Sequence, residues 1–404
     1  MNGGILFLAH RQPFPPNRGD SIRSWNILKA LAKLAPVHLV SFADSDPETQ
    51  QALDQVCASA HLIRDQKGKT TAMAAALLSG RPASVEMFSS PTFQAAVDLV
   101  LNEHDIATVY AFSGQMGQYV GDLPSSIRFV MDFTDVDSEK FASYGRMAVG
   151  VAGLANRFEA RRLRAFELQV AKRADINLFV SKTEEQMFRR VAGNGNVPLG
   201  VLENGVDLDR FSPGHGLCDN IDRDTPLIVF TGQMDYPPNV GAASFFAREV
   251  LPIVRDRQAD ARFAIVGRAP TEDVRQLAEL PGVIVTGEVP DTRPWLASAR
   301  VVVAPLRIAR GIQNKVLEAM ASGKAVVASP EAAEGIDACN GKEILIAGSA
   351  AAQADAIISL LHDPVRRERM ELAARAAMEA RYSWDAKMAP LAAFVFPSNE
   401  RVAA

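Results

Sequence analysis

The sequence predicts an α/β protein with two Rossmann-like domains whose parallel sheets face a central cleft. The chain has 404 residues, which is more than one compact core usually holds. Short β-branched runs alternate with amphipathic helical stretches, as in parallel βαβ units. This alternation lapses around Asp207–Pro226, a polar stretch with proline and glycine, and then restarts. Because open parallel sheets bind ligands at the carboxyl ends of their strands, we expect a ligand site in the cleft.

Each half of the chain starts with a strand and continues with strands separated by helices. A helix is expected over Ile22–Leu34, with apolar residues on one face and Asp20 as its N-cap. Pro364–Arg381 is strongly helical, and a last helix is expected near Trp384–Phe394. The expected strands are Gly4–Ala9, Val37–Phe42, Ile106–Ala111, Arg128–Asp132 and Asp175–Val180, then Leu227–Thr231, Arg262–Val266, Val283–Val285, Val301–Ala304, Ala325–Ala328 and a weaker Ile344–Ala347. The expected domains are residues 1–206 and 207–380, with residues 381–404 as a helical segment that packs back on the N-terminal domain.

Composition excludes several classes of protein. The formal charge is −4, which gives no overall attraction to nucleic acid. Cys57, Cys218 and Cys339 lie far apart and form no CxxC pair, so neither a zinc site nor a disulfide framework is indicated. The chain starts without the pattern of a signal peptide, and no apolar run is long enough to span a bilayer. A cytoplasmic protein without metal or other cofactor is the expectation.

The segment from Val301 to Ser329 has the order strand, glycine loop, helix start, strand. The helix is expected to begin near Gln313 and to end at Ser322, and free N–H groups at such a start bind phosphate oxygens. Lys315 opposes the helix dipole in the first turn, which is understandable if an anion binds there. A generic βαβ crossover with a solvated Lys and Glu is the competing interpretation. The residues expected at the ligand are Arg307, Arg310, Gly311, Ile312, Gln313, Asn314, Lys315 and Glu318.

This segment resembles the C-terminal domain of the retaining GT-B glycosyltransferases of the family 4 group. Glu318–Val327 (EAMASGKAVV) is similar to the second half of the family's two-glutamate motif, and Gly311 matches its first glycine. The resemblance implies that Glu318 contacts the ribose of a nucleotide-sugar. Arg310 stands where the family has the first glutamate, so the hexose contact does not carry over; a contact with the pyrophosphate or with a carboxylated sugar is implied instead.

Further donor residues follow from the same resemblance. Gly232 and Gln233 end a strand as in the family's glycine loop at the donor phosphates, and Gly267 ends the next strand beside the nucleobase pocket. Backbone groups near Glu288 and Val289 would read the base. A tight turn is the competing interpretation for Gly232.

Two clusters are candidates for the acceptor side. His10, Arg18, Gly19 and Asp20 follow the first strand and resemble the family's acceptor-side glycine loop. Asp132 and Asp135 follow another strand, where a carboxylate can accept the acceptor's proton. Capping of the next helix by Asp135 or Asp137 is equally compatible with the sequence, and a metal site is the least favoured alternative.

Nearly the whole chain resembles the sugar transferases of bacterial PEP-CTERM/exosortase exopolysaccharide clusters. We therefore predict transfer of a hexose from a nucleotide diphosphate sugar, with UDP expected, to a glycan or lipid-linked glycan, with retention. Asp132, Asp135, Arg310 and Lys315 are the expected catalytic groups. A nucleotide-sugar epimerase and an inactive nucleotide-sugar-binding protein stay open as alternatives. The basic amphipathic stretch Ala155–Ala174 is either a solvated face or a peripheral contact with the inner membrane surface.

Overall fold

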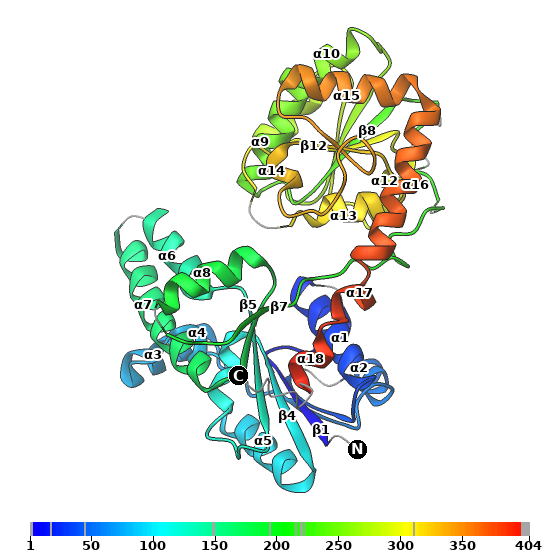
Figure 1. Ribbon diagram of the computed structural model, residues 1–404. Helices are drawn as coiled ribbons and strands as arrows, with labels where there is room; N and C mark the ends of the chain where they lie inside the picture. Colours follow the sequence, from blue (N-terminus) through cyan, green and yellow to red (C-terminus); the bar gives the residue numbers. More distant parts are fainter. Residues whose placement is uncertain are drawn as a thin grey trace. The chain divides into compact units, whose positions relative to one another are not determined.

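The chain forms two domains, which we describe separately (Figure 1). The N-terminal domain comprises Met1–Asn204 and Lys387–Ala404, and the C-terminal domain comprises Gly205–Ala386. The polypeptide therefore passes between the domains twice, close to the boundaries expected at 206 and 380. The computed structural model describes residues 3–16, 18–43, 46–147, 150–193, 195–214, 216–218, 221–222, 224–309 and 312–396.

Each domain contains one fully parallel sheet. In both sheets the strand order reverses beside the first strand, between β1 and β4 and between β8 and β11, so the predicted pair of Rossmann-like domains is confirmed. The described N-terminal sheet has the order β3 (Ser59–Ile63), β2 (Val37–Phe42), β1 (Gly4–Ala9), β4 (Ile106–Phe112), β5 (Arg128–Thr134), β6 (Ile176–Phe179) and β7 (Leu199–Val201). The described C-terminal sheet has the order β10 (Val283–Gly287), β9 (Arg262–Val266), β8 (Leu227–Thr231), β11 (Val301–Ala304), β12 (Val326–Ala328) and β13 (Leu345–Ile346).

Helices connect the strands, as parallel pairing requires. Those of the N-terminal domain are α1 (Gly19–Ala32), α2 (Pro47–Asp54), α3 (Lys69–Ser79), α4 (Ala83–Glu86), α5 (Pro91–Glu103), η1 (Gly114–Tyr119), α6 (Asp137–Met147), α7 (Gly150–Arg173), α8 (Lys182–Ala192) and α18 (Leu391–Val395). Those of the C-terminal domain are α9 (Pro237–Phe245), η2 (Phe246–Val250), α10 (Leu251–Arg255), α11 (Glu272–Gln276), η3 (Leu277–Glu279), α12 (Arg293–Ser298), α13 (Asn314–Ala321), α14 (Pro330–Ala333), α15 (Ala350–His362) and α16 (Pro364–Arg381), while α17 (Trp384–Met388) spans the return to the N-terminal domain.

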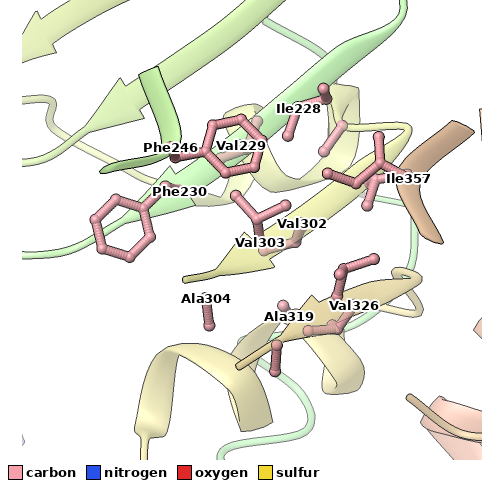
Figure 2. Packing of buried hydrophobic residues seen from close by; sticks show 14 of the residues in the cluster. Ile228, Val229, Phe230, Phe246, Val302, Val303, Ala304, Ala319, Val326 and Ile357 are labelled. Atoms are coloured by element: carbon pink, nitrogen blue, oxygen red, sulfur yellow. The ribbon is translucent and has the colours of Figure 1, made fainter. Parts of the chain in front are cut away.

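The central strands of the C-terminal domain are buried along their whole length. Val229 and Phe230 on β8 are fully buried, and Val303 on β11 is nearly so. Helices supply the other side of the contacts, for example Ala319 from α13 and Ile357 from α15 (Figure 2). Strands covered on both faces by helices are expected to be continuous apolar runs, which explains why these strands were easy to predict.

The N-cap of the first helix and two edge strands differ from the predictions. The first helix begins at Gly19 with Arg18 as its N-cap, so the prediction that Asp20 caps it was wrong. Asp20 lies inside the first turn, and its carboxylate accepts from Arg11 Nη1 at 2.8 Å instead. Strands β3 and β7 were not predicted, because their residues are only half-buried and lack a clear apolar run.

Candidate functional site

Two glycine backbones touch at the carboxyl ends of β8 and β9. Gly232 N–H donates to Val266 O at 3.0 Å, and a Cβ atom on Gly267 would lie 1.7 Å from Gly232 O. Gly267 also has a φ of 153°, which favours glycine. No side chain fits at this position, so the sequence must keep Gly267. The result is a backbone surface without side chains of its own, beside the point where the strand order of the sheet reverses between β8 and β11.

A polar network covers this glycine surface. Asn239 on α9 donates from Nδ2 to Gln233 O at 2.9 Å, and a Cβ on Gly232 would lie 2.8 Å from the same Nδ2. Arg268 donates from Nη2 to Gln233 Oε1 at 3.0 Å. Sequence reasoning missed Arg268, although it directly follows the predicted Gly267. It places a positive charge beside Gln233.

Lys315 lies in the first turn of α13 and points to the same surface. Its Nζ donates to Asn239 Oδ1, lies 4.7 Å from the centre of the Phe230 ring, and would be 3.3 Å from a Cβ on Gly232. Burial lowers the pKa of Lys315 to about 8, and the nearby carboxylate of Glu318 partly opposes this shift. A half-buried cation with few anionic neighbours is a suitable partner for a bound anion.

Glu318 lies one turn further along the same helix. Burial raises the pKa of its carboxyl group to about 7, while Arg210 and Lys315 oppose the shift. The helix itself forms as predicted, with Gln313 as N-cap, Ser322 as C-cap and a left-handed Gly323 with a φ of 66°. Lys315 and Glu318 thus stand on one helix whose start lies near the glycine surface.

The other predicted donor residues are less closely grouped. Arg307 is exposed and lies over the Phe245 ring at 5.5 Å. Glu288 is exposed and Val289 half-buried, directly after β10 at the end of the sheet. Ile312 is half-buried and Asn314 is exposed. Arg310 and Gly311 lie outside the described residues.

In the N-terminal domain Asp132 forms a buried ion pair. Its carboxylate has no exposed surface and accepts from Arg23 Nη2 at 2.9 Å, from Tyr110 Oη at 2.8 Å and from Thr134 N–H at 3.0 Å. Arg23, which is 1% exposed, also donates to Asn204 Oδ1 at 2.8 Å. The structure therefore does not expose Asp132 at a surface where an acceptor hydroxyl would bind.

Asp135 is the exposed member of the aspartate cluster. Partial burial of its carboxyl group, together with the negative charges of Glu184 and Asp137, raises its pKa to about 6. The N–H groups of Val136 and Ser138 at the start of α6 donate to Glu184 and to Glu167, so carboxylates of α8 and α7 bind this helix start. These two N–H groups are thus bound by glutamates of neighbouring helices and not by Asp135 or Asp137, the two residues that the sequence offered as caps.

The predicted acceptor-side residues come together after β1. His10 Nε2 lies 3.4 Å from Asp20 Oδ2, and Arg11 donates to the same oxygen. The hydrogen bond from His10, followed by the interactions with Arg11, holds the pKa of Asp20 well below its usual range. Arg18 and Asp20 line a pocket of about 360 Å³, whereas Gly19 lies on the exposed start of α1.

The described residues contain no cluster of three or more His, Cys, Asp or Glu side chains with the arrangement of a metal site. No helix among them has the length and apolarity needed to cross a membrane.

A family model matches part of the C-terminal domain, and curated relatives match about half of the chain. Residues 225–363 match a family model described as Glycosyl transferases group 1. The phosphatidyl-myo-inositol mannosyltransferase of Mycobacterium tuberculosis is 33% identical over 200 residues, which are 45% of this chain and 50% of that protein. The GDP-mannose-dependent monoacylated alpha-(1-6)-phosphatidylinositol monomannoside mannosyltransferase of Corynebacterium glutamicum is 27% identical over 245 residues, or 54% and 61% of the two chains. The chain thus spans about half the length of the first of these curated relatives.

Solved structures are similar over nearly the full chain. Sucrose-phosphate synthase from Thermosynechococcus elongatus has a TM-score of 0.61 at 17% identity, covering 95% of this chain and 96% of that one. The Anabaena protein HepE in complex with UDP has a TM-score of 0.62 at 15% identity, covering 97% and 98%. The glycosyltransferase WaaG, involved in lipopolysaccharide biosynthesis, has a TM-score of 0.60 at 15% identity, covering 98% and 100%. The predicted GT-B fold is confirmed.

Proposed function

We propose that this chain is a glycosyltransferase that moves a hexose from a nucleotide diphosphate sugar to a glycan or lipid-linked glycan. The observation that carries the proposal is the position of Lys315 against the touching backbones of Gly232 and Gly267, beside the strand-order reversal of the C-terminal sheet. Glu318 follows one turn further along the same helix. All four residues lie inside the segment that matches the glycosyltransferase model. In this assignment the C-terminal domain binds the donor and the N-terminal domain binds the acceptor.

The chemistry follows from the charges. Departure of the nucleoside diphosphate builds negative charge on its phosphates, and fixed cations and N–H groups aimed at that charge lower the barrier. In this proposal Lys315, Arg268 and the N–H groups of the first turn of α13 do this, and Arg307 adds charge from the loop after β11. Glu318 would accept hydrogen bonds from the ribose hydroxyls. No metal ion takes part in this proposal.

The donor proposed from the sequence is a UDP-sugar. A curated relative is named as GDP-mannose-dependent, so GDP-mannose is the alternative that a test must include. We also propose retention at the anomeric carbon, a place in exopolysaccharide synthesis of the PEP-CTERM/exosortase type, and a cytoplasmic location; each of these is carried by the resemblance in sequence.

The test begins with donor binding and continues with turnover. Thermal shift with UDP-glucose, GDP-mannose and ADP-glucose identifies the donor, because a ligand of the native state raises the melting temperature. Lys315→Met should then lower turnover by about 10²-fold or more. Lys342→Met, which removes an exposed lysine of the same domain, is the matched control and should leave turnover unchanged.

Two outcomes would contradict the proposal. If no nucleotide-sugar raises the melting temperature, the C-terminal site is not a donor site. If the nucleotide-sugar is isomerised at the same rate without any acceptor glycan and no sugar is transferred when glycan is added, the chain is an epimerase rather than a transferase.

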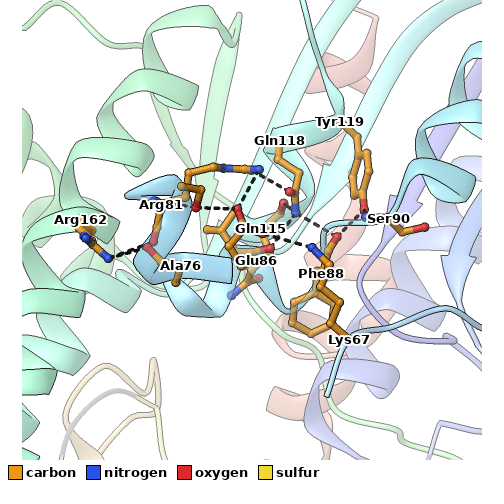
Figure 3. A network of polar contacts seen from close by, with 12 residues as sticks. Lys67, Ala76, Arg81, Glu86, Phe88, Ser90, Gln115, Gln118, Tyr119 and Arg162 are labelled. Atoms are coloured by element: carbon orange, nitrogen blue, oxygen red, sulfur yellow. Dashed lines mark hydrogen bonds and ion pairs between the residues drawn. The ribbon is translucent and has the colours of Figure 1, made fainter. Parts of the chain in front are cut away.

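We further propose a peripheral contact with the membrane through α3 and α7. Their exposed apolar side chains are Met73, Leu77 and Leu78 on α3, and Leu154 and Phe158 on α7; we call this set the apolar face. A polar network holds the two helices together, since Arg162 on α7 donates to Ala76 O and Arg81 O (Figure 3). Arg161 is exposed and follows Phe158 by three positions on α7, so the helical period places both on one face. Basic and apolar side chains on one face are the combination that interfacial helices use on anionic lipid.

A further inference from the structure

The guanidinium group of Arg375 joins the end of α13 to a segment from much earlier in the sequence. Arg375 lies on α16, which packs beside α13 (Figure 1). Its Nη1 donates to Ala321 O at 2.7 Å, and Ala321 is the last residue of α13. The same nitrogen donates to Phe211 O at 2.9 Å and to Leu208 O at 3.2 Å. One side chain therefore bonds to both the helix and the earlier segment.

The guanidinium group suits the end of a helix and is itself held in place. The last carbonyl groups of a helix have no partner within it, and the helix dipole favours a cation beside them. Arg375 supplies both a donor and a positive charge at Ala321. Its Nε donates to Glu379 Oε1 at 2.6 Å, which fixes the plane of the guanidinium group. The contact with α13 thus comes from an oriented side chain.

The earlier segment is Asp207–Pro213, which we call the linker segment because it follows the first passage of the chain between the domains at Gly205. It is ordered by its own hydrogen bonds, since Asp207 Oδ1 accepts from Arg210 N–H at 2.9 Å. Pro213 also packs on the residue after α13, because a Cβ atom on Gly323 would lie 3.1 Å from Pro213 Cγ. The linker segment therefore contacts the end of α13 both directly and through Arg375.

These contacts matter because α13 is short. It has eight residues, and a helix of that length depends on tertiary contacts for its stability and position. Lys315 and Glu318 lie within two turns of Ala321 on the same helix. Any displacement at the end of α13 is therefore passed on to both side chains.

We infer that Arg375 is a positioning residue, which fixes the end of α13 to the linker segment and thereby holds Lys315 and Glu318 in place for the donor. The inference rests on the proposed function for the word donor. The anchoring of α13 is argued only from hydrogen bonds within the C-terminal domain. Arg375 is not assigned a contact with any substrate.

Hydrogen exchange of the full chain without ligand tests the anchoring. Arg375→Met removes every donor of the side chain, and Arg375→Lys is the milder variant, whose single ammonium group cannot replace a guanidinium group. In both variants the amides of α13 should exchange about tenfold faster or more, with the β9 amides as the internal reference. Arg369→Met removes an exposed arginine from the same helix and should exchange as the wild type does. Wild-type exchange of α13 in both Arg375 variants overturns the inference.

A double-mutant cycle tests whether Arg375 acts through α13 on the donor site. Calorimetry with UDP and GDP as probes should show about tenfold weaker nucleotide binding in Arg375→Met. This loss should be smaller in the Glu318→Gln background, because the effects of two residues that act through one another do not add. An equal loss in both backgrounds overturns the inference. If the wild type binds neither probe while exchange of α13 responds to Arg375→Met, the proposed donor site is refuted and Arg375 stands as the anchor of α13.

Discussion

At the scale of single residues, the buried ion pair between Arg23 and Asp132 links separate segments of the N-terminal domain. It joins the first helix to the end of β5, and through Asn204 it reaches the residue where the chain leaves the domain. Both charges are buried, so each depends on the other for compensation. Asp132 therefore stabilises the N-terminal domain from its interior, and if this domain binds the acceptor as proposed, the exposed Asp135 is the better candidate for contact with it.

Asp132→Asn tests this assignment. Removing one partner of a buried ion pair leaves an uncompensated charge, so the N-terminal domain should lose about 3–5 kcal/mol of stability. Hydrogen exchange of the β4 and β5 amides measures this loss, with the amides of β8 and β11 as the internal reference. Asp135→Asn should leave exchange unchanged. If Asp132→Asn instead abolishes turnover while exchange stays as in the wild type, Asp132 has a direct catalytic role.

The raised pKa of Glu318 gives a prediction with a defined sign. Because its folded pKa of about 7 lies above the ordinary value of 4.5, its contribution to stability is fully present below pH 4.5 and is lost as the pH rises through about 7. Glu318→Gln keeps the shape but cannot ionise. Its melting temperature should therefore rise relative to the wild type between pH 4.5 and 7, corresponding to about 1 kcal/mol or more. A difference that does not change with pH would show that the carboxyl group is not buried as described.

At the scale of elements, the strands that are buried on both faces could be predicted from the sequence, and the half-buried strands β3 and β7 could not. The buried strands β1, β2, β8, β9 and β11 were predicted with their observed bounds, because an apolar run flanked by turn residues has few other interpretations. The edge strands β3 and β7 were missed because their residues are only half-buried and form no clear apolar run.

The residues of the candidate site also fall into those that the sequence indicated and those that it did not. Lys315, Glu318 and the two touching glycines lie in segments with a local motif, and the sequence indicated all four. Arg268 has no such signal, because its contact with Gln233 depends on which strand ends meet at one edge of the sheet. Contacts between segments that are distant in the sequence depend on the topology of the sheet, so a local sequence pattern does not predict them.

The apolar face on α3 and α7 gives a prediction for these two elements. Leu77 and Leu78 are 75% and 91% exposed, so replacing both with Glu should cost little stability and should place negative charge toward an anionic lipid surface. Co-sedimentation with phosphatidylglycerol vesicles should fall by about tenfold or more, since two leucine side chains each contribute about 1.5–3 kcal/mol when buried.

The matched control for this prediction is Leu372→Glu on α16. Leu372 is 67% exposed but belongs to the C-terminal domain, so vesicle binding should be retained. Equal loss of binding in Leu372→Glu would mean that net charge, rather than the apolar face, governs association.

At the scale of the whole molecule, the chain leaves the N-terminal domain after Asn204 and returns to it at Lys387. The returning segment packs on the N-terminal sheet. Leu391 and Val395 on α18 are each 1% exposed, Thr108 donates to Val395 O at 2.9 Å, and Arg128 donates to Phe394 O at 2.6 Å. The last helix thus completes a domain that began nearly 400 residues earlier in the sequence.

Removal of residues 390–404 should therefore destabilise the N-terminal domain alone. The loss of two buried apolar side chains corresponds to about 3–6 kcal/mol, and the freed Thr108 and Arg128 add to it. Calorimetry should show the transition of the N-terminal domain at a lower temperature, while the transition that responds to nucleotide-sugar stays in place. Leu391→Ala should shift the same transition by a smaller amount. If truncation lowers both transitions equally, the two domains unfold cooperatively, and the C-terminal segment stabilises the whole molecule rather than the N-terminal domain alone.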